Sequence, residues 1–171
     1  MADTKISLLT TDSAPHRSLD FAPTYDASAL ATKKVALRDF GAYTIDAMCA
    51  SASPADATTY YFGSFPSAAP TTTEGVRRLY IPRTGIITQA LVHAINTGTA
   101  GSGESGSLYV RKSVTTDTLI TSAFTTNAQF ILITAINVSV SATEFVEIKW
   151  VTPTYATNPT GVFIHVALFV E

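Results

Sequence analysis

The chain has 171 residues, a net charge of −2 and a hydrophobic fraction of 46%, but only 14% of its residues are charged. Hydroxyl side chains take the place of charge, with 27 Thr and 15 Ser, and Thr suits the half-buried surface of a β-sheet. This composition excludes a disordered chain and a helical bundle, and it predicts an all-β protein. No basic run exceeds two residues and no apolar run could span a bilayer, so we expect neither a nucleic-acid partner nor a membrane span.

The first third of the chain is more polar than the rest. Residues 1–59 hold five basic and seven acidic residues, whereas residues 60–171 hold six of each. The apolar residues of the first third are scattered and too few for a core of their own. We therefore predict an extended N-terminal arm over residues 1–50, with a short strand at residues 32–37, and a linker over residues 51–59.

From residue 60 onward, short apolar segments alternate with turns. Strands are expected at residues 60–62, 77–81, 86–95, 108–112, 118–121, 130–133, 136–140, 144–152 and 162–170. Short strands with turns about every 8–12 residues are typical of β-sandwiches. The predicted fold is a jelly-roll-like antiparallel β-sandwich over residues 60–171, preceded by the arm.

Two of these strands carry further information. In residues 144–152, Val146, Ile148 and Trp150 share one face and are predicted to be core. Residues 162–170 are apolar on both faces apart from His165, so a second layer must cover them. That layer is another sheet, the arm or a second subunit. We favour a subunit interface, formed by the outward-facing residues Phe163, His165, Ala167 and Phe169.

The residues that could carry chemistry do not form a recognisable catalytic or metal-binding pattern. The single cysteine, Cys49, has apolar neighbours and is predicted to be a buried, inert thiol. His93 and His165 lie in apolar strands and are predicted to be core or interface imidazoles, with a pH-sensitive contact if they meet across a symmetry axis. Tyr155 lies in a loop between two prolines and is a candidate glycan contact. We expect no enzyme activity, no metal and no cofactor.

Two segments near the N-terminus have recognisable sequence motifs. They are ADTKISLL at residues 2–9 and ATKKVALRDF at residues 31–40. Together they resemble the N-terminal module of tailed-bacteriophage virion proteins, in which TKIS-x-L is followed by TKKV-x-L-x-D-(L/F). Residues 19–25 depart from the family's pattern between the motifs. The resemblance implies virion attachment through Lys5, Ile6, Leu8, Leu9, Lys33, Lys34, Val35, Leu37 and Phe40.

The rest of the chain is similar to a C-terminal β domain found in phage structural proteins. The similarity is carried by segments such as RRLYIP at residues 77–82, GTAG at 98–101, VEIK at 146–149 and PTYATNPT at 153–160. Taken together, the two resemblances imply a bacteriophage virion structural protein, made in the host cytoplasm and located in the virion.

The short chain favours a head decoration (cement) protein or a short head fibre over a long tail fibre. The expected partners are the major capsid protein or another virion protein, and further copies of the chain in a homotrimer. The alternative is the receptor-binding tip domain of a tail fibre, whose partner would be a host surface glycan.

Overall fold

The computed structural model describes residues 21–26, 31–36, 42–63 and 69–171. The chain divides into two compact units, Met1–Ala42 and Tyr43–Glu171. In the first unit, β1 (Phe21–Asp26) and β2 (Ala31–Ala36) pair antiparallel, and β2 lies on the segment predicted as a strand. None of the described residues belongs to a helix, and so none lies in a helix that could cross a membrane.

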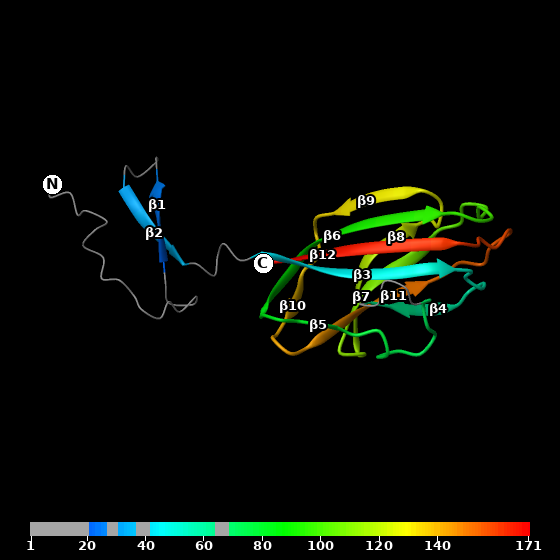
Figure 1. Cartoon of the computed structure of the whole chain (residues 1–171), viewed down its shortest axis with the longest axis horizontal. Helices are drawn as coiled ribbons and strands as arrows, with labels where there is room; N and C mark the ends of the chain where they lie inside the picture. The colour runs from blue at the N-terminus through cyan, green and yellow to red at the C-terminus, as the bar shows by residue number, and fades with distance from the viewer. Residues whose placement is uncertain (1–20, 27–30, 37–41, 64–68) are drawn as a thin grey trace. The chain divides into compact units, whose positions relative to one another are not determined.

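The second unit contains two antiparallel sheets (Figure 1). The β12 sheet has the order β10-β6-β12-β3, with β9 also paired to β6. Its strands are β3 (Tyr43–Ala52), β6 (Gly85–Asn96), β9 (Gln129–Ile133), β10 (Val138–Val140) and β12 (Val162–Val170). The β11 sheet has the order β4-β11-β7-β8, with β5 also paired to β11. Its strands are β4 (Thr59–Phe62), β5 (Leu79–Tyr80), β7 (Gly106–Lys112), β8 (Thr116–Phe124) and β11 (Phe145–Val151).

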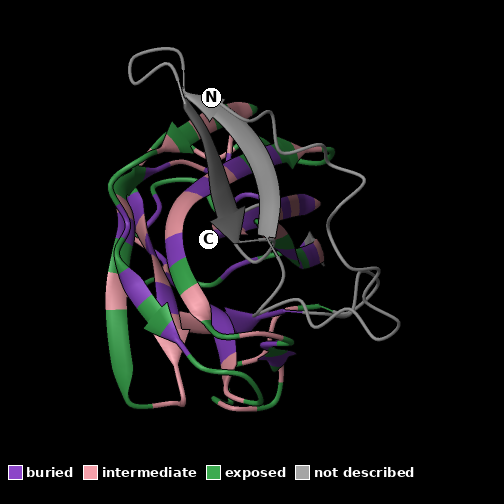
Figure 2. Ribbon diagram, turned by 90° about the vertical axis from the view of Figure 1, so that its left-hand side faces the viewer, coloured by how far each residue is buried: buried purple, intermediate pink, exposed green. Residues whose placement is uncertain are grey.

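The core lies between the two sheets, so buried and exposed residues alternate along the strands (Figure 2). Val146, Ile148 and Trp150 are fully buried, which confirms their predicted face of β11. The ring of Trp150 meets Phe124 of β8 edge-on, with centroids 6.0 Å apart. Burial of each large apolar side chain stabilises the fold by about 1.5–3 kcal/mol. The predicted class, an all-β antiparallel sandwich, is thus confirmed.

The sandwich begins earlier than the sequence indicated. β3 pairs with β12 along its whole length, from Tyr43 opposite Val170 to Ala52 opposite Val162. Residues 43–52, predicted as the end of the arm and the start of the linker, therefore belong to the β12 sheet, and residues 53–58 connect β3 of this sheet to β4 of the other. The strand escaped prediction because Ala47, Cys49 and Ala52, three of its inward residues, are small, so its alternation is weak.

The position of β12 explains one of its two apolar faces. It is a central strand, paired with β3 on one side and β6 on the other. Val162, Ile164, Val166, Leu168 and Val170 face the core and are at most 1% exposed. The alternate residues face outward, away from the β11 sheet, so the core accounts for only one of the two apolar faces.

Candidate functional site

The outer side of the β12 sheet carries mostly apolar side chains, with His93, His165, Asp46 and Gln89 among them, and we call it the apolar face. Cross-strand register aligns these side chains in rows across four strands, in the order β3, β12, β6 and β9. The first row is Met48, His165, His93 and Phe130, and the second is Asp46, Ala167, Leu91 and Leu132. Phe163 and Ile95 pair on one flank of these rows, and Phe169 and Gln89 pair on the other.

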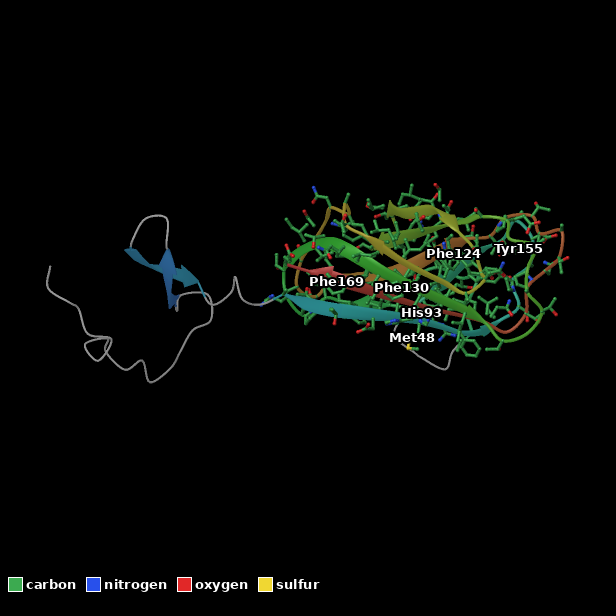
Figure 3. All side chains as sticks on the ribbon, turned by 90° about the horizontal axis from the view of Figure 1, so that it is seen from above. Met48, His93, Phe124, Phe130, Tyr155 and Phe169 are labelled. Carbon is green, nitrogen blue, oxygen red and sulfur yellow. The ribbon has the colours of Figure 1, made fainter. Side chains whose placement is uncertain are left out.

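Several side chains of the apolar face are unusually exposed for their type. Phe130 is 69% exposed, Leu132 54%, and Met48 and Ile95 each 39%. They make up half of the eight large hydrophobic residues that are exposed in the described part of the chain. Contiguous apolar surface of this kind marks interaction sites in soluble proteins. Figure 3 shows Phe130, His93 and Met48 on this sheet.

The two histidines predicted as core or interface residues both lie on this face. They are direct cross-strand neighbours, although 72 positions separate them in the sequence. His165 Nε2 lies 2.8 Å from Asp46 Oδ1, and the His93 ring meets Phe130 edge-on with centroids 6.2 Å apart. Neither histidine is in the core, and they meet within one chain rather than needing a symmetry axis to bring them together.

A shallow depression of about 190 Å³ lies between the first row and the flanking pair Phe163 and Ile95. Its lining includes Met48, His93, Ile95, Phe163 and His165, from β3, β6 and β12. An apolar cavity of about 150 Å³ is large enough to bind benzene, so the depression has room for one aromatic ring. The arrangement can therefore receive an apolar side chain from outside the sandwich.

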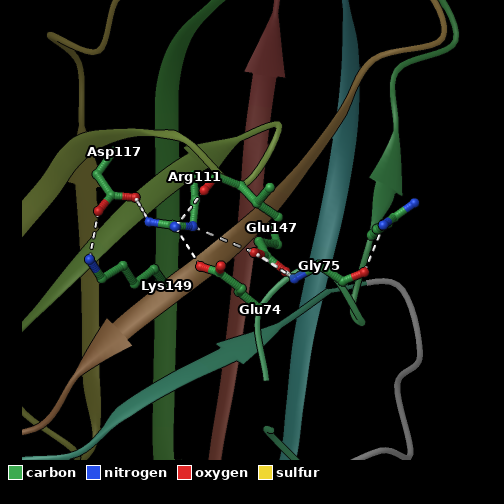
Figure 4. Close-up of polar contacts among 8 residues, drawn as sticks. Glu74, Gly75, Arg111, Asp117, Glu147 and Lys149 are labelled. Carbon is green, nitrogen blue, oxygen red and sulfur yellow. Dashed lines mark hydrogen bonds and ion pairs between the residues drawn. The ribbon is translucent and has the colours of Figure 1, made fainter. Parts of the chain in front are cut away.

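The outer side of the β11 sheet is organised differently, around a polar network (Figure 4). The guanidinium of Arg111 on β7 is at its centre and donates to Asp117 at 2.8 Å and to Glu74 at 2.6 Å. Its Nε lies 3.8 Å from the Glu147 carboxylate, and Lys149 donates to Asp117 at 2.6 Å. Charged side chains from β7, β8 and β11 thus neutralise one another on this face.

Glu147 ties the connection between β4 and β5 to this network. Its side chain is fully buried, and both of its carboxylate oxygens accept from the Gly75 backbone N–H, at 2.9 and 3.1 Å. Burial raises the pKa of Glu147, against the opposing effects of the Gly75 N–H and of Arg111. Burial alone would also raise the pKa of Asp117, but hydrogen bonds from Lys149 and Arg111 lower it. The charged centre of this face is therefore covered by groups of the same chain.

The loops at residues 97–105 and 153–161 lie together at one end of the sandwich. Thr97 N–H donates to the Gly161 carbonyl at 3.0 Å, and Thr160 N–H donates to the Thr99 carbonyl at 3.0 Å. Tyr155, the candidate glycan contact, is only 6% exposed, and burial raises the pKa of its hydroxyl. A ring that stacks on a sugar must present one face to solvent, and Tyr155 does not do so here.

The structure also places the residues predicted for an oligomer interface, the single cysteine and part of the predicted attachment set. Phe163, His165, Ala167 and Phe169, predicted as an oligomer interface, all lie on the outward side of β12. Cys49 is 2% exposed, as predicted, and burial raises the pKa of its thiol to about 12. Of the attachment residues, Lys33, Lys34 and Val35 lie on β2. The remaining attachment residues lie outside the described part of the chain: Lys5, Ile6, Leu8, Leu9, Leu37 and Phe40.

Sequence reasoning missed Met48, Leu91, Ile95, Phe130 and Leu132 as parts of one surface. They come from β3, β6 and β9, and only the strand order brings them beside β12. The signal that was available is the run of residues 86–95, which lacks a polar face just as β12 does. Two neighbouring strands that are both apolar on both sides indicate an apolar outer face. Among the residues that the structure describes, no group of three potential metal ligands converges.

Known proteins show little similarity to this chain. No family model matches the sequence, and no curated protein matches it. Among solved structures, the crystal structure of FLHE is similar with a TM-score of 0.44 and 13% sequence identity, over 77% of this chain and 96% of that one. A similarity of this size carries no argument about function.

Proposed function

We propose that this chain is a bacteriophage virion structural protein, a head decoration (cement) protein or a short head fibre. The pair of N-terminal motifs, at residues 2–9 and 31–40, carries the proposal. The division of the chain supports it, since the motifs fall in the first unit and the sandwich forms the second. In this arrangement the first unit binds the particle and the second is displayed on it.

Attachment works by burying apolar and basic residues of the N-terminal unit against the shell. Lys33, Lys34 and Val35, two basic residues and an apolar one, follow one another in the sequence of β2. A protein that binds only the assembled shell stabilises it by mass action, because its binding energy is lost when the shell opens. A decoration protein needs no catalytic group, because its function depends on the surfaces through which it binds the shell.

The copy number of the chain in purified particles tests this proposal. Quantitative mass spectrometry against the major capsid protein should give one copy per shell subunit or a fixed large fraction of that for a decoration protein. A small number, set by vertices, would indicate a head fibre. Absence from the particle would contradict both forms of the proposal.

Removal of the N-terminal unit tests the attachment step. A chain that begins at Tyr43 keeps β3 and with it both sheets, so it is expected to remain folded by circular dichroism. It should no longer bind particles that lack the protein, whereas the full chain should bind them. Binding by the shortened chain would contradict attachment through residues 1–42.

The alternative function, a host-glycan receptor at a fibre tip, rests on the loop cluster at residues 97–105 and 153–161. Hydrogen bonds hold these two loops together at one end of the sandwich, as in many binding sites built from loops on a rigid scaffold. Because Tyr155 is buried, a glycan would have to contact other residues of the cluster. A specific hit on a glycan array that survives the Tyr155→Phe substitution would favour this alternative.

A further inference from the structure

We propose that the apolar face is the surface through which copies of this chain associate, packing against the same face of a neighbouring copy. The proposal concerns the sandwich itself and does not depend on attachment to a particle. It extends the predicted interface on β12 to β3, β6 and β9, and it assigns the central contact to Phe130.

The size of the face corresponds to a small interface. Four strands about 4.8 Å apart, with outward side chains about 6.8 Å apart (four each on β3, β12 and β6 and two on β9), present about 450 Å². This lies within the about 300–600 Å² of the largest apolar patch on a typical monomer, and two copies packed through it bury about twice this area, at the low end of specific interfaces. The projecting side chain of Phe130 adds contact area beyond this flat projection.

The composition of the face indicates what covers it. The only charged side chain in its rows is Asp46 on the edge strand β3, where it already pairs with His165. A partner with a strongly charged surface would find no complementary charge at the centre of this face. A second copy of the same apolar face matches it in chemistry, and two sheets that pack face to face interdigitate their side chains.

The shape of the face is complementary to itself. Phe130 projects from β9 with 69% of its surface exposed, beside the depression of about 190 Å³ lined by Met48, His93 and Phe163. In a symmetric assembly every copy contributes the same groups to each contact. The Phe130 ring of one copy can therefore fill the depression of the next, while its own depression receives another ring.

Sedimentation equilibrium of the full chain tests this proposal. The wild-type chain should have twice the mass of one chain, because a face that packs against itself closes as a two-fold dimer. Leu132→Glu should weaken association about 30-fold or more, because it places a carboxylate in an apolar contact of hot-spot strength. Leu119→Glu is the matched control, since Leu119 is 48% exposed on β8 in the other sheet, and it should leave the mass unchanged.

A second variant separates loss of association from loss of folding. Phe130→Ser removes a side chain that is already 69% exposed, so its thermal unfolding should match that of the wild type at concentrations low enough for both to be monomeric, while its association is weakened. A wild-type chain that stays monomeric at the highest soluble concentration would overturn the proposal. An oligomer that neither Leu132→Glu nor Phe130→Ser weakens would also overturn it. Either result would leave the copy number in the particle, and hence the proposed virion role, untouched.

Discussion

The two sheets of this sandwich bury their inner faces in the same way and treat their outer faces in opposite ways. On the β11 sheet, Arg111 and Glu147 form the centre of a charged network, and the β4–β5 connection covers it. On the β12 sheet, Phe130 and Leu132 stand exposed beside a row of apolar neighbours. Packing in the core explains why the inward-facing residues of each strand are apolar. The outward-facing residues show whether other parts of the same chain cover the outer face of the sheet.

The network on the β11 sheet also shows why a buried charge is tolerated there. A buried carboxylate is costly unless hydrogen bonds and an opposite charge compensate it. Glu147 has both, from the Gly75 N–H and from Arg111. These contacts fix the β4–β5 connection at one point of the sheet. If one of the compensating partners is removed, the free-energy cost of burying the Glu147 carboxylate is no longer offset.

The largest expected effect comes from breaking this network at its centre. Arg111→Ala removes the cation that lies 3.8 Å from the fully buried Glu147 carboxylate, and the fold should lose about 3 kcal/mol of unfolding free energy. Lys112→Ala is the control, since Lys112 lies 3.9 Å from Glu144 at a more exposed site and should cost about 1 kcal/mol or less. Urea denaturation measures both, and equal losses would contradict a central role for Arg111.

A smaller effect is expected at Asp117, and it depends on pH. Its pKa is lowered in the folded state by Lys149 and Arg111, which outweigh burial, so its charge stabilises the fold above about pH 3.9 and this stability is lost as the pH falls through the lowered value. Asp117→Asn should cost about 1 kcal/mol at neutral pH and converge with the wild type in acid. A deficit that is independent of pH would show that packing, rather than charge, is involved.

Glu147 should show the opposite dependence on pH. Its pKa is raised by burial, so the stability that it contributes is fully present below about pH 4.3 and is lost as the pH rises through the raised value. The difference in unfolding free energy between the wild type and Glu147→Gln should therefore shift against the wild type as the pH increases over that range. Urea titrations at several pH values measure this slope, and a slope of the other sign would contradict the burial of the carboxylate.

The last prediction concerns β3, whose two sides differ in solvent exposure. Met48 and Cys49 are neighbours on β3, but Met48 is 39% exposed on the apolar face and Cys49 is 2% exposed in the core. Because burial also raises the thiol pKa to about 12, Cys49 should resist a thiol reagent in the native protein and react fully in urea. Rapid reaction of the native thiol would mean that β3 opens readily at the sheet edge.

Much of this fold could be predicted from the sequence, because most strands carry strong apolar alternation. The pattern of residues 144–152 identified the core face of β11, and residues 162–170 match β12 at both ends. β3 could not be found in the same way, because Ala47 and Cys49 give little contrast to their exposed neighbours. A strand of small residues is recognised only through the strand that it pairs with.

The candidate site was harder to predict than the fold. The outward residues of β12 were identified from one strand, whereas Phe130 and Met48 join them only through the order of strands in the sheet. Glu147 occupies a position of β11 that the alternating pattern assigns to the solvent-facing side, yet the β4–β5 connection buries it. Both features depend on contacts between distant segments, on which local periodicity carries no information.

Side-chain footprinting with hydroxyl radicals tests most directly whether the two outer faces differ as described. The full chain would be labelled at low and at high concentration, and modification would be measured at Met48 and Phe130 on the apolar face and at Tyr80 on the β11 sheet, which is 63% exposed. If copies associate through the apolar face, modification of Met48 and Phe130 falls with concentration while that of Tyr80 stays constant. Unchanged modification of Met48 and Phe130, in a sample that is oligomeric at the higher concentration, would contradict the account.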